Sequence, residues 1–330
     1  MLRIFHKTNY GFIRWWRMAA GLTIAFIVAG LVTFGITGGV NYSIEFTGGT
    51  LMQVQFKEAP DVAKVRATLD AAGITGSEIQ QFGAATEYTI RARDEKQVEA
   101  QAAGAEGISK TIGTALEQAF GAGSVTIVRT EAVGPRVGAE LRSGAATAML
   151  IASLFTLIYL AIRFDWRFGM AAVLSTSHDI LVTFAFIKLL NIEVSLTVVA
   201  AILTLLGYSA NDTIIIFDRV RENLKKGAKG LSLSAILDRS INETLPRSIL
   251  THATTLAATL ALLLLAGEVI RPFALVMAFG VFVATFSSIY VAGPVLLWIE
   301  SKYPREGGAK ARAAATGQAP VRGGRPATAR

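Results

Sequence analysis

Four ionisable side chains lie inside long apolar runs of this sequence, and a fifth lies at the edge of one. They are His178, Asp179, Asp212 and His252, with Arg247 at the edge. A charged Asp in the middle of a bilayer costs about 2.5 to 3.5 kcal/mol on insertion scales, so each carboxyl group is expected to face a protein interior and to have a function. Because burial and a nearby Arg act in opposite directions on the pKa of a carboxyl group, such a group can bind and release a proton near neutral pH.

Helical spacing predicts polar faces around these residues, because positions three or four apart share a face of a helix. Hydroxyl residues accompany Asp179 at this spacing, and a stripe of threonines follows Arg247. We predict a proton-relay or coupling role for Asp212, Arg247 and Asp179, with an Asp212–Arg247 pair at its centre. The predicted supporting polar residues are Asn211, His178, Tyr208, Thr251 and Thr255.

Structural interpretations of the same residues stay open. Ser and Thr in membrane helices often bond to their own backbone, so the threonine stripe can serve packing alone. Asp179 directly follows His178, and the two can form a pair that holds helices together. Asn211 and Asp212 are two adjacent polar residues in an otherwise apolar helix, which favours a functional role for Asp212 over a structural one. His252, which stands alone, is expected to be structural.

Six apolar runs predict the elements that carry these residues. Of the 330 residues, 52% are hydrophobic and 17% are charged, and the mean hydropathy is +0.48. This is more apolar side chain than a soluble protein of this size can bury in one core. The first run lacks a clear A-x-A cleavage pattern and is longer than a typical signal sequence, so it is expected to be retained as an anchor. Crossing a bilayer takes roughly 20 residues. The predicted transmembrane helices are 18–36, 145–162, 168–187, 194–217, 248–266 and 272–299.

The distribution of charge predicts the orientation in the membrane. Lys and Arg are concentrated in residues 1–17, in the loop 218–247 and in a basic, solvated tail at 300–330. Six spans place these three segments on one side, which the positive-inside rule assigns to the cytoplasm, so both termini are expected there. Segment 37–144 is then the large outer region. The net charge of +8 fits this distribution, and no nucleic-acid partner is expected.

The outer region has the pattern of a small α+β domain. Alternating apolar residues predict strands at 50–56, 77–82, 88–91 and 124–130, and helical spacing predicts helices at 60–69 and 94–120. The order β-α-β-β-α-β indicates a ferredoxin-like fold. The predicted architecture is therefore a six-helix transmembrane bundle with a ferredoxin-like periplasmic domain.

The residue types argue against an enzyme. With 0 Cys and 3 His, the chain offers no disulfide, thiolate zinc site or Cys nucleophile. No nucleophile stands near a base in the sequence, so no catalytic centre, metal or cofactor is expected. The outer domain is interpreted as a binding or moving part.

Two glycine-containing motifs frame the outer domain where it meets the membrane. Gly48 and Gly49 follow the first span, and Gly134, Pro135 and Gly138 precede the second. They would suit hinges. Ordinary turns are the alternative interpretation of the same residues.

Several strings in this chain resemble the SecF family of bacterial protein-export membrane proteins. The most specific is GYSANDT at 207–213, which runs into IFDRVREN at 216–223. Ser43 and Glu45 depart from the family pattern, which more usually has Gly and Asp there. The resemblance extends over the chain through FTGGT at 46–50, VGPRVG at 133–138, His178–Asp179 and NETLPRS at 242–248.

The resemblance implies a half-transporter of the resistance-nodulation-division type in the bacterial inner membrane. It implies a SecD-like partner with a similar arrangement of spans, the SecYEG channel, often YajC, and preproteins that are pulled outward with the proton gradient after the SecA step. In this family pattern Asp212 matches the proton-relay carboxylate and Arg247 its charged partner. Two alternatives are a proton-driven exporter of small molecules or lipids and a passive translocon scaffold.

Overall fold

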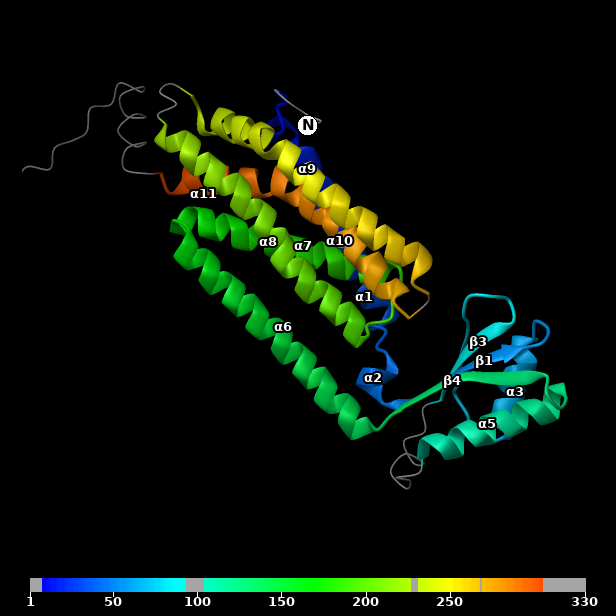
Figure 1. Cartoon of the computed structure of the whole chain (residues 1–330). Helices are drawn as coiled ribbons and strands as arrows, with labels where there is room; N and C mark the ends of the chain where they lie inside the picture. Colours follow the sequence, from blue (N-terminus) through cyan, green and yellow to red (C-terminus); the bar gives the residue numbers. More distant parts are fainter. Residues whose placement is uncertain (1–7, 93–103, 227–230, 268, 305–330) are drawn as a thin grey trace, which may run out of the picture.

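The computed structural model of the chain describes residues 8–92, 104–226, 231–267 and 269–304. These residues form a bundle of long helices and a smaller α+β domain at one end of it (Figure 1). The predicted basic tail lies outside the described residues from position 305 onward. The same is true of the first part of the predicted helix 94–120, through residue 103.

Six helical stretches of the described chain are long and apolar enough to cross a membrane, which confirms the predicted class of fold. The sixth stretch consists of two helices, the first of which ends at Tyr290. The break is explained by Pro294, which has no N–H group to donate to the Tyr290 carbonyl and whose ring would clash with it. The stretches are η1 (Ile13–Trp15) with α1 (Trp16–Thr37), α6 (Pro135–Arg163), α7 (Trp166–Leu189), α8 (Leu196–Lys225), α9 (Leu233–Leu265), and α10 (Arg271–Tyr290) with α11 (Ala292–Lys302).

Much of the segment 218–247, expected as a loop, is helical. Helix α8 continues to Lys225, and α9 begins at Leu233, where the Ser232 hydroxyl accepts a hydrogen bond from the Ala235 N–H at 3.2 Å. Arg, Lys and Glu are strong helix formers, so the charged residues extend both helices beyond their apolar runs.

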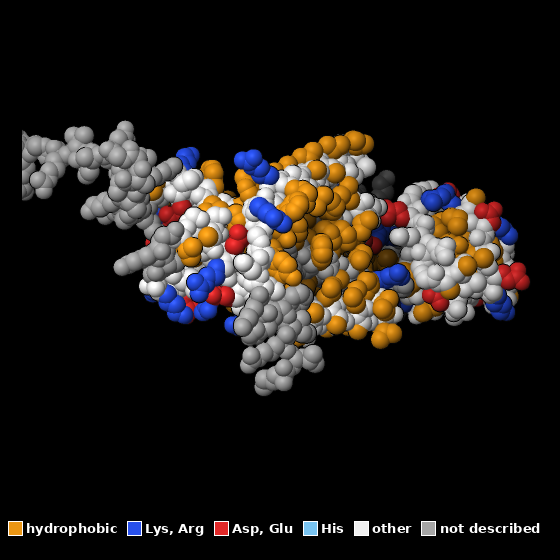
Figure 2. Space-filling view, turned by 90° about the horizontal axis from the view of Figure 1, so that it is seen from above, with side chains coloured by type: hydrophobic (Ala, Val, Ile, Leu, Met, Phe, Trp, Pro, Cys, Tyr) orange, Lys and Arg blue, Asp and Glu red, His pale blue; other side chains and the backbone are white. Residues whose placement is uncertain are grey.

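Helices α7, α8 and α10 form the interior of the bundle, and α1, α6 and α9 lie at its periphery. Half or more of the apolar stretch is buried in the three interior spans, against less than one fifth in the peripheral ones. Figure 2 shows apolar side chains as a broad surface over the bundle, with Lys, Arg, Asp and Glu gathered toward its two ends. Such a surface is expected of helices that face lipid.

The α+β domain is a four-stranded antiparallel sheet with two helices. The strand order β2-β3-β1-β4 is that of the predicted ferredoxin-like fold. Alternate residues of β1, such as Met52 and Val54, are fully buried against Leu69 and Ile112 on the helices. The elements are β1 (Gly49–Phe56), α3 (Val62–Ala71), β2 (Glu78–Gln81), β3 (Glu87–Ala92), α5 (Gly104–Phe120) and β4 (Val125–Val133).

Backbone hydrogen bonds fasten the segment between α1 and the sheet to the connection between α7 and α8. Tyr42 and Val194 form a parallel β-bridge, in which the Ser43 N–H donates to the Val194 carbonyl at 2.9 Å. The short helix α2 (Ile44–Thr47) follows, and β1 begins at its end. The sheet is thus attached to the interior helices as well as to its own flanking spans.

Candidate functional site

Asp179 lies where three interior helices meet. Its Oδ2 accepts hydrogen bonds from the Ser209 hydroxyl of α8 at 2.5 Å and the Ser287 hydroxyl of α10 at 2.6 Å, and its Oδ1 lies 2.9 Å from Nδ1 of His178. The carboxylate is buried. A cavity of about 10 Å³ beside it, lined also by Thr176, is close to the minimum space for one water molecule.

Asp212 is buried on the same helix as Ser209, one turn further along α8. Its Oδ1 accepts a hydrogen bond from the Ser248 hydroxyl of α9 at 2.6 Å, whereas its Oδ2 is buried without a hydrogen-bond partner. The hydroxyl groups of Thr213 and Thr176 are also buried without partners. The two carboxyl groups therefore differ: Asp179 is held by three side chains, and Asp212 keeps one oxygen free to bind a proton.

The expected Asp212–Arg247 pair is not formed in this conformation. Among the ion pairs and hydrogen bonds of the described residues, none joins the two, and Arg247 is exposed at the edge of the bundle. The reason is helical geometry: adjacent residues point about 100° apart around a helix. Because Ser248 faces Asp212, Arg247 is turned away from the contact between α8 and α9.

The supporting residues divide between the interface of α8 and α9 and the outer surface. The Tyr208 hydroxyl donates to the Thr251 carbonyl at 3.4 Å, across that interface. Thr255 donates to the same carbonyl at 3.0 Å, so the threonine stripe bonds largely to its own backbone. Asn211 is exposed, although it lies next to Asp212 in a helix of the membrane bundle.

The glycine motifs form one tightly packed junction between the sheet and the bundle. A Cβ atom on Gly138 would lie 2.9 Å from the Gly48 nitrogen, and one on Gly48 would lie 2.9 Å from the Pro135 Cα. Gly48 and Gly49 also have positive φ values of 72° and 120°. Gly134 has open space around it and a φ of −67°, so only the other glycines are required here.

An ion pair also holds the sheet against the bundle. Arg91 of β3 is buried, and its guanidinium pairs with Glu193 of the α7–α8 connection and with Glu78 of β2. The same guanidinium lies 3.4 Å from the Tyr42 carbonyl. Burial raises the pKa of Glu193, and the charge of Arg91 acts against that rise.

Glu45, which departs from the family pattern, caps an interior helix. Its carboxylate accepts a hydrogen bond at 2.6 Å from the N–H of Leu196, the first residue of α8. The Ser43 hydroxyl lies 3.2 Å from the same carboxylate oxygen. A negative charge at a helix N-terminus is stabilising.

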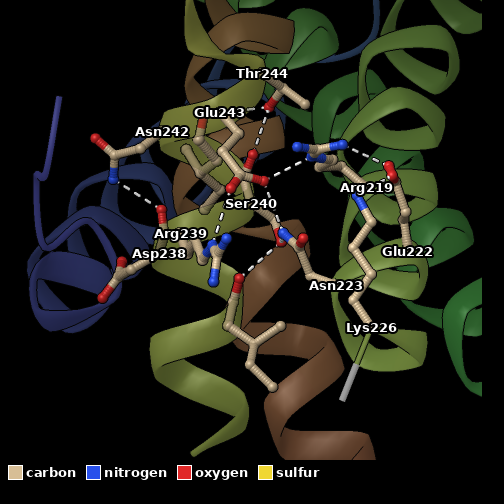
Figure 3. A network of polar contacts seen from close by, with 12 residues as sticks. Arg219, Glu222, Asn223, Lys226, Asp238, Arg239, Ser240, Asn242, Glu243 and Thr244 are labelled. Carbon is tan, nitrogen blue, oxygen red and sulfur yellow. Dashed lines mark hydrogen bonds and ion pairs between the residues drawn. The ribbon is translucent and has the colours of Figure 1, made fainter. Parts of the chain in front are cut away.

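A polar network ties the charged ends of α8 and α9 together, at the end of the bundle far from the α+β domain (Figure 3). Glu243 accepts hydrogen bonds from Arg219 at 2.6 Å, Asn223 at 2.8 Å and Arg239 at 2.9 Å. Asn242 exchanges two hydrogen bonds of 2.9 Å with the backbone of Tyr10. The segment before α1 is thereby fixed to α9.

Sequence reasoning missed the contacts made by small or distant residues. The role of Ser287 could not be predicted because Ser in a membrane helix often bonds to its own backbone, as the neighbouring Ser288 does. Arg91 and Glu193 are 102 positions apart, and no local pattern connects them. Ser248 lay within a recognised motif, but its bond to Asp212 required knowledge of which face of α9 packs on α8.

Family models match most of the chain. Residues 111–302 match the model "Protein export membrane protein SecD/SecF, C-terminal", and residues 33–60 match the "SecD/SecF GG Motif" model. Protein translocase subunit SecF of Gemmatimonas aurantiaca is 79% identical over 320 residues, which cover 97% of this chain and 96% of the relative. The same subunit of Vibrio alginolyticus is 41% identical, with 88% and 90% covered.

Solved structures agree with these matches. The crystal structure of SecDF from Thermus thermophilus superposes with a TM-score of 0.77 at 34% identity over 91% of this chain. A SecDF structure in a super-membrane-facing form gives 0.64 at 33% identity over 96%. The chain spans only 40% and 41% of those two solved chains.

The fold and the matches together define a multi-pass membrane protein of the protein-export class. Within that class, the chain belongs to the SecF family of protein translocase subunits.

Proposed function

We propose that this chain is the SecF half of a proton-driven protein-export complex in the bacterial inner membrane. Its partners are a SecD-like subunit, the SecYEG channel and, in some complexes, YajC, and its substrates are preproteins in the late stage of export. Membership in the SecF family supports the assignment. The SecD-like partner is supported by the solved SecDF chains, of which this chain spans about 40%.

The observation that carries the proton-driven function is the environment of Asp212. Burying a carboxyl group in a membrane bundle costs free energy, so a functional role is the first hypothesis for Asp212. Its Oδ2 has no hydrogen-bond partner and is therefore open to bind a proton. Protonation removes its charge and weakens the charge-assisted hydrogen bond from Ser248, so the contact between α8 and α9 loosens.

The movement would pass to the α+β domain through α8. The first turn of α8 is held by Glu45 and by the β-bridge at Val194, and both contacts lie beside the glycine junction. Moving one charge across 100 mV releases about 2.3 kcal/mol. A bias of that size changes a two-state equilibrium more than tenfold. In this proposal the glycine junction is the hinge.

The exposed polar residues at the depth of Asp212 support a second membrane subunit. Arg247 is next to Ser248, which contacts Asp212, and it is exposed, as is Asn211. A cation at this depth is unfavourable in lipid and is expected to meet another protein surface. We assign this surface to the SecD-like subunit and expect a carboxylate of that subunit, or Asp212 in another conformation, to pair with Arg247.

The orientation follows from the same proposal. The charged network of Figure 3 lies at the end of the bundle opposite the α+β domain. Assigning that end to the cytoplasm places both termini there, in agreement with the positive-inside rule, and places residues 37–144 in the periplasm.

Export into inverted membrane vesicles tests the function. Vesicles would contain the chain with its SecD-like partner and SecYEG, and export would be measured with and without a proton gradient. We expect Asp212→Asn to abolish the benefit of the gradient at equal recovery of the complex. Thr204→Val is the control, since Thr204 on the same helix is exposed and its hydroxyl bonds to the Ala200 carbonyl of its own helix. An undiminished benefit in Asp212→Asn would contradict the role of Asp212 and would place the coupling proton at Asp179 or in the partner subunit.

A further inference from the structure

His252 occupies a buried position, one turn from the residue that contacts Asp212, that packing alone does not explain. The residue lies on α9, one turn after Ser248, and only 6% of it is exposed. Its Nδ1 is buried without a hydrogen-bond partner. The ring packs edge-on against Tyr208 of α8, with ring centroids 5.3 Å apart. Phe would fill the same space without the free-energy cost of an unpaired buried nitrogen.

The antiparallel helices place His252 on a definite side of Asp212. The contact between Ser248 and Asp212 fixes the relative depth of α8 and α9. Tyr208 precedes Asp212 by one turn, and His252 follows Ser248 by one turn, which is about 6 Å along each axis. Both rings therefore lie between Asp212 and the end of the bundle nearer the α+β domain (Figure 1).

Few other ionisable groups face this position. Helix α10 packs against both α8 and α9; it has Arg271 as its first residue and Tyr290 as its last, and residues 272–289 between them include no Asp, Glu, Lys, Arg or His. Helices α11 and η1 also contact α9, but they lie at the end of the bundle remote from the α+β domain, where Arg14, Glu300 and Lys302 are. Among the described residues, the ionisable groups of α8 on this side are thus Tyr208, whose ring contacts His252, and Asp212 one turn away, whereas Arg247 of α9 points out of the contact between the two helices.

We propose that His252 is a proton-carrying group that passes protons from the domain side of the bundle to Asp212, an inference that rests on the proposed function. In this step a proton leaves the imidazolium ring and binds Oδ2 of the Asp212 carboxylate, directly or through an intervening hydroxyl group. One positive and one negative charge become two neutral groups, so charge is conserved. The neutral ring then takes the next proton from the domain side. Imidazole suits this step because its ordinary pKa, about 6.5, lies close to working pH.

His252→Phe in the complete complex tests the proposal, because it keeps the ring packing and removes the proton-binding nitrogens. At equal recovery of the complex, we expect the gradient-stimulated part of export to fall by about tenfold or more, since a positioned proton-transfer group is lost. Its dependence on pH between about 6 and 7.5 should flatten. Thr259→Val is the matched control: Thr259 is buried two turns beyond on the same face and bonds to the Leu256 carbonyl at 3.0 Å.

Wild-type gradient stimulation and an unchanged pH profile in His252→Phe would overturn the proposal. If Asp212→Asn loses the stimulation in the same assay, the proposed function stands and only the role of His252 fails. If Asp212→Asn also keeps it, the proposed function fails as well.

A measurement on the unaltered chain covers the case in which His252→Phe does not assemble. In ¹⁵N-histidine spectra of the complex, the His252 ring should change protonation between about pH 5 and 8, and the midpoint should move in Asp212→Asn. A ring that stays neutral throughout this range would overturn the proposal.

Discussion

The two buried Asp residues are chemically alike but differ in their partners, and that difference assigns them different roles. Asp179 contacts three donor groups from α7, α8 and α10, whereas Asp212 accepts one hydrogen bond and has an unpartnered oxygen. Hydrogen bonds to a charged group contribute about 1.5–3 kcal/mol each. We therefore expect Asp179 to hold the interior helices together in addition to any role in proton transfer.

Two substitutions of Asp179 separate these roles. Asp179→Ala leaves the hydroxyls of Ser209 and Ser287 buried without this acceptor, and at about 1–3 kcal/mol for each such group we expect it to destabilise the bundle by about 2–6 kcal/mol, measured by thermal unfolding in detergent. Asp179→Asn keeps an acceptor of the same shape and should retain most of the stability. If Asp179→Asn also keeps gradient-stimulated export, the residue is structural; if export is lost while the fold is kept, it belongs to the proton path.

At the scale of elements, the sequence predicted what local patterns control and missed what depends on packing. The strand 50–56 followed from strict alternation, and the spans from their apolar length. Which face of α9 packs on α8 could not be predicted, because Arg247 and Ser248 are neighbours and one sequence does not show which of the two side chains points toward α8. The contact between α2 and α6 was likewise hidden, since glycine is equally common in hinges, turns and close packing.

The glycine junction gives a prediction with an internal control. Gly138→Ala places a methyl group 2.9 Å from the Gly48 backbone nitrogen, which is held by its hydrogen bond to the Ile44 carbonyl, so it should destabilise the junction by about 1–3 kcal/mol. Gly134→Ala, four residues earlier, meets open space and should change stability by less than about 0.5 kcal/mol. Hydrogen exchange of β1 and β4 would measure both. Equal protection in the two variants would show that the close approach is not required.

For the whole molecule, the orientation of the α+β domain depends on a few contacts with the α7–α8 connection. Arg91 supplies the charge in this contact, and the segment 41–43 supplies the backbone bridge. The sequence predicted a separate domain but not this attachment, because Arg91 and Glu193 are 102 positions apart and Tyr42 and Val194 are further apart still. If these polar contacts break, the domain stays attached through its flanking spans and the glycine junction, so it can be released from the α7–α8 connection without unfolding, as the proposed export cycle needs.

Arg91→Met tests the attachment. It removes the hydrogen bonds to Glu193 and should weaken docking by about 1.5–3 kcal/mol, measured as faster hydrogen exchange at Ser43 and Val194. Because Arg91 opposes the rise in the pKa of Glu193, that pKa should rise further in the variant. An acid with a raised pKa in the docked state favours docking below its ordinary pKa and loses that effect as pH rises through the raised value. Docking in Arg91→Met should therefore be more favourable at acidic than at neutral pH, and pH-independent docking would contradict this.

The central claim is that a proton on Asp212 moves the α+β domain, and a distance measurement tests it most directly. The chain has 0 Cys, so spin labels at Gln118→Cys on α5 and Leu190→Cys beside α7 would be specific within this chain. In the complete complex, we predict that a proton gradient shifts the distance distribution between the labels, and that Asp212→Asn shows one distribution with and without the gradient. A gradient-dependent shift that persists unchanged in Asp212→Asn would contradict the account.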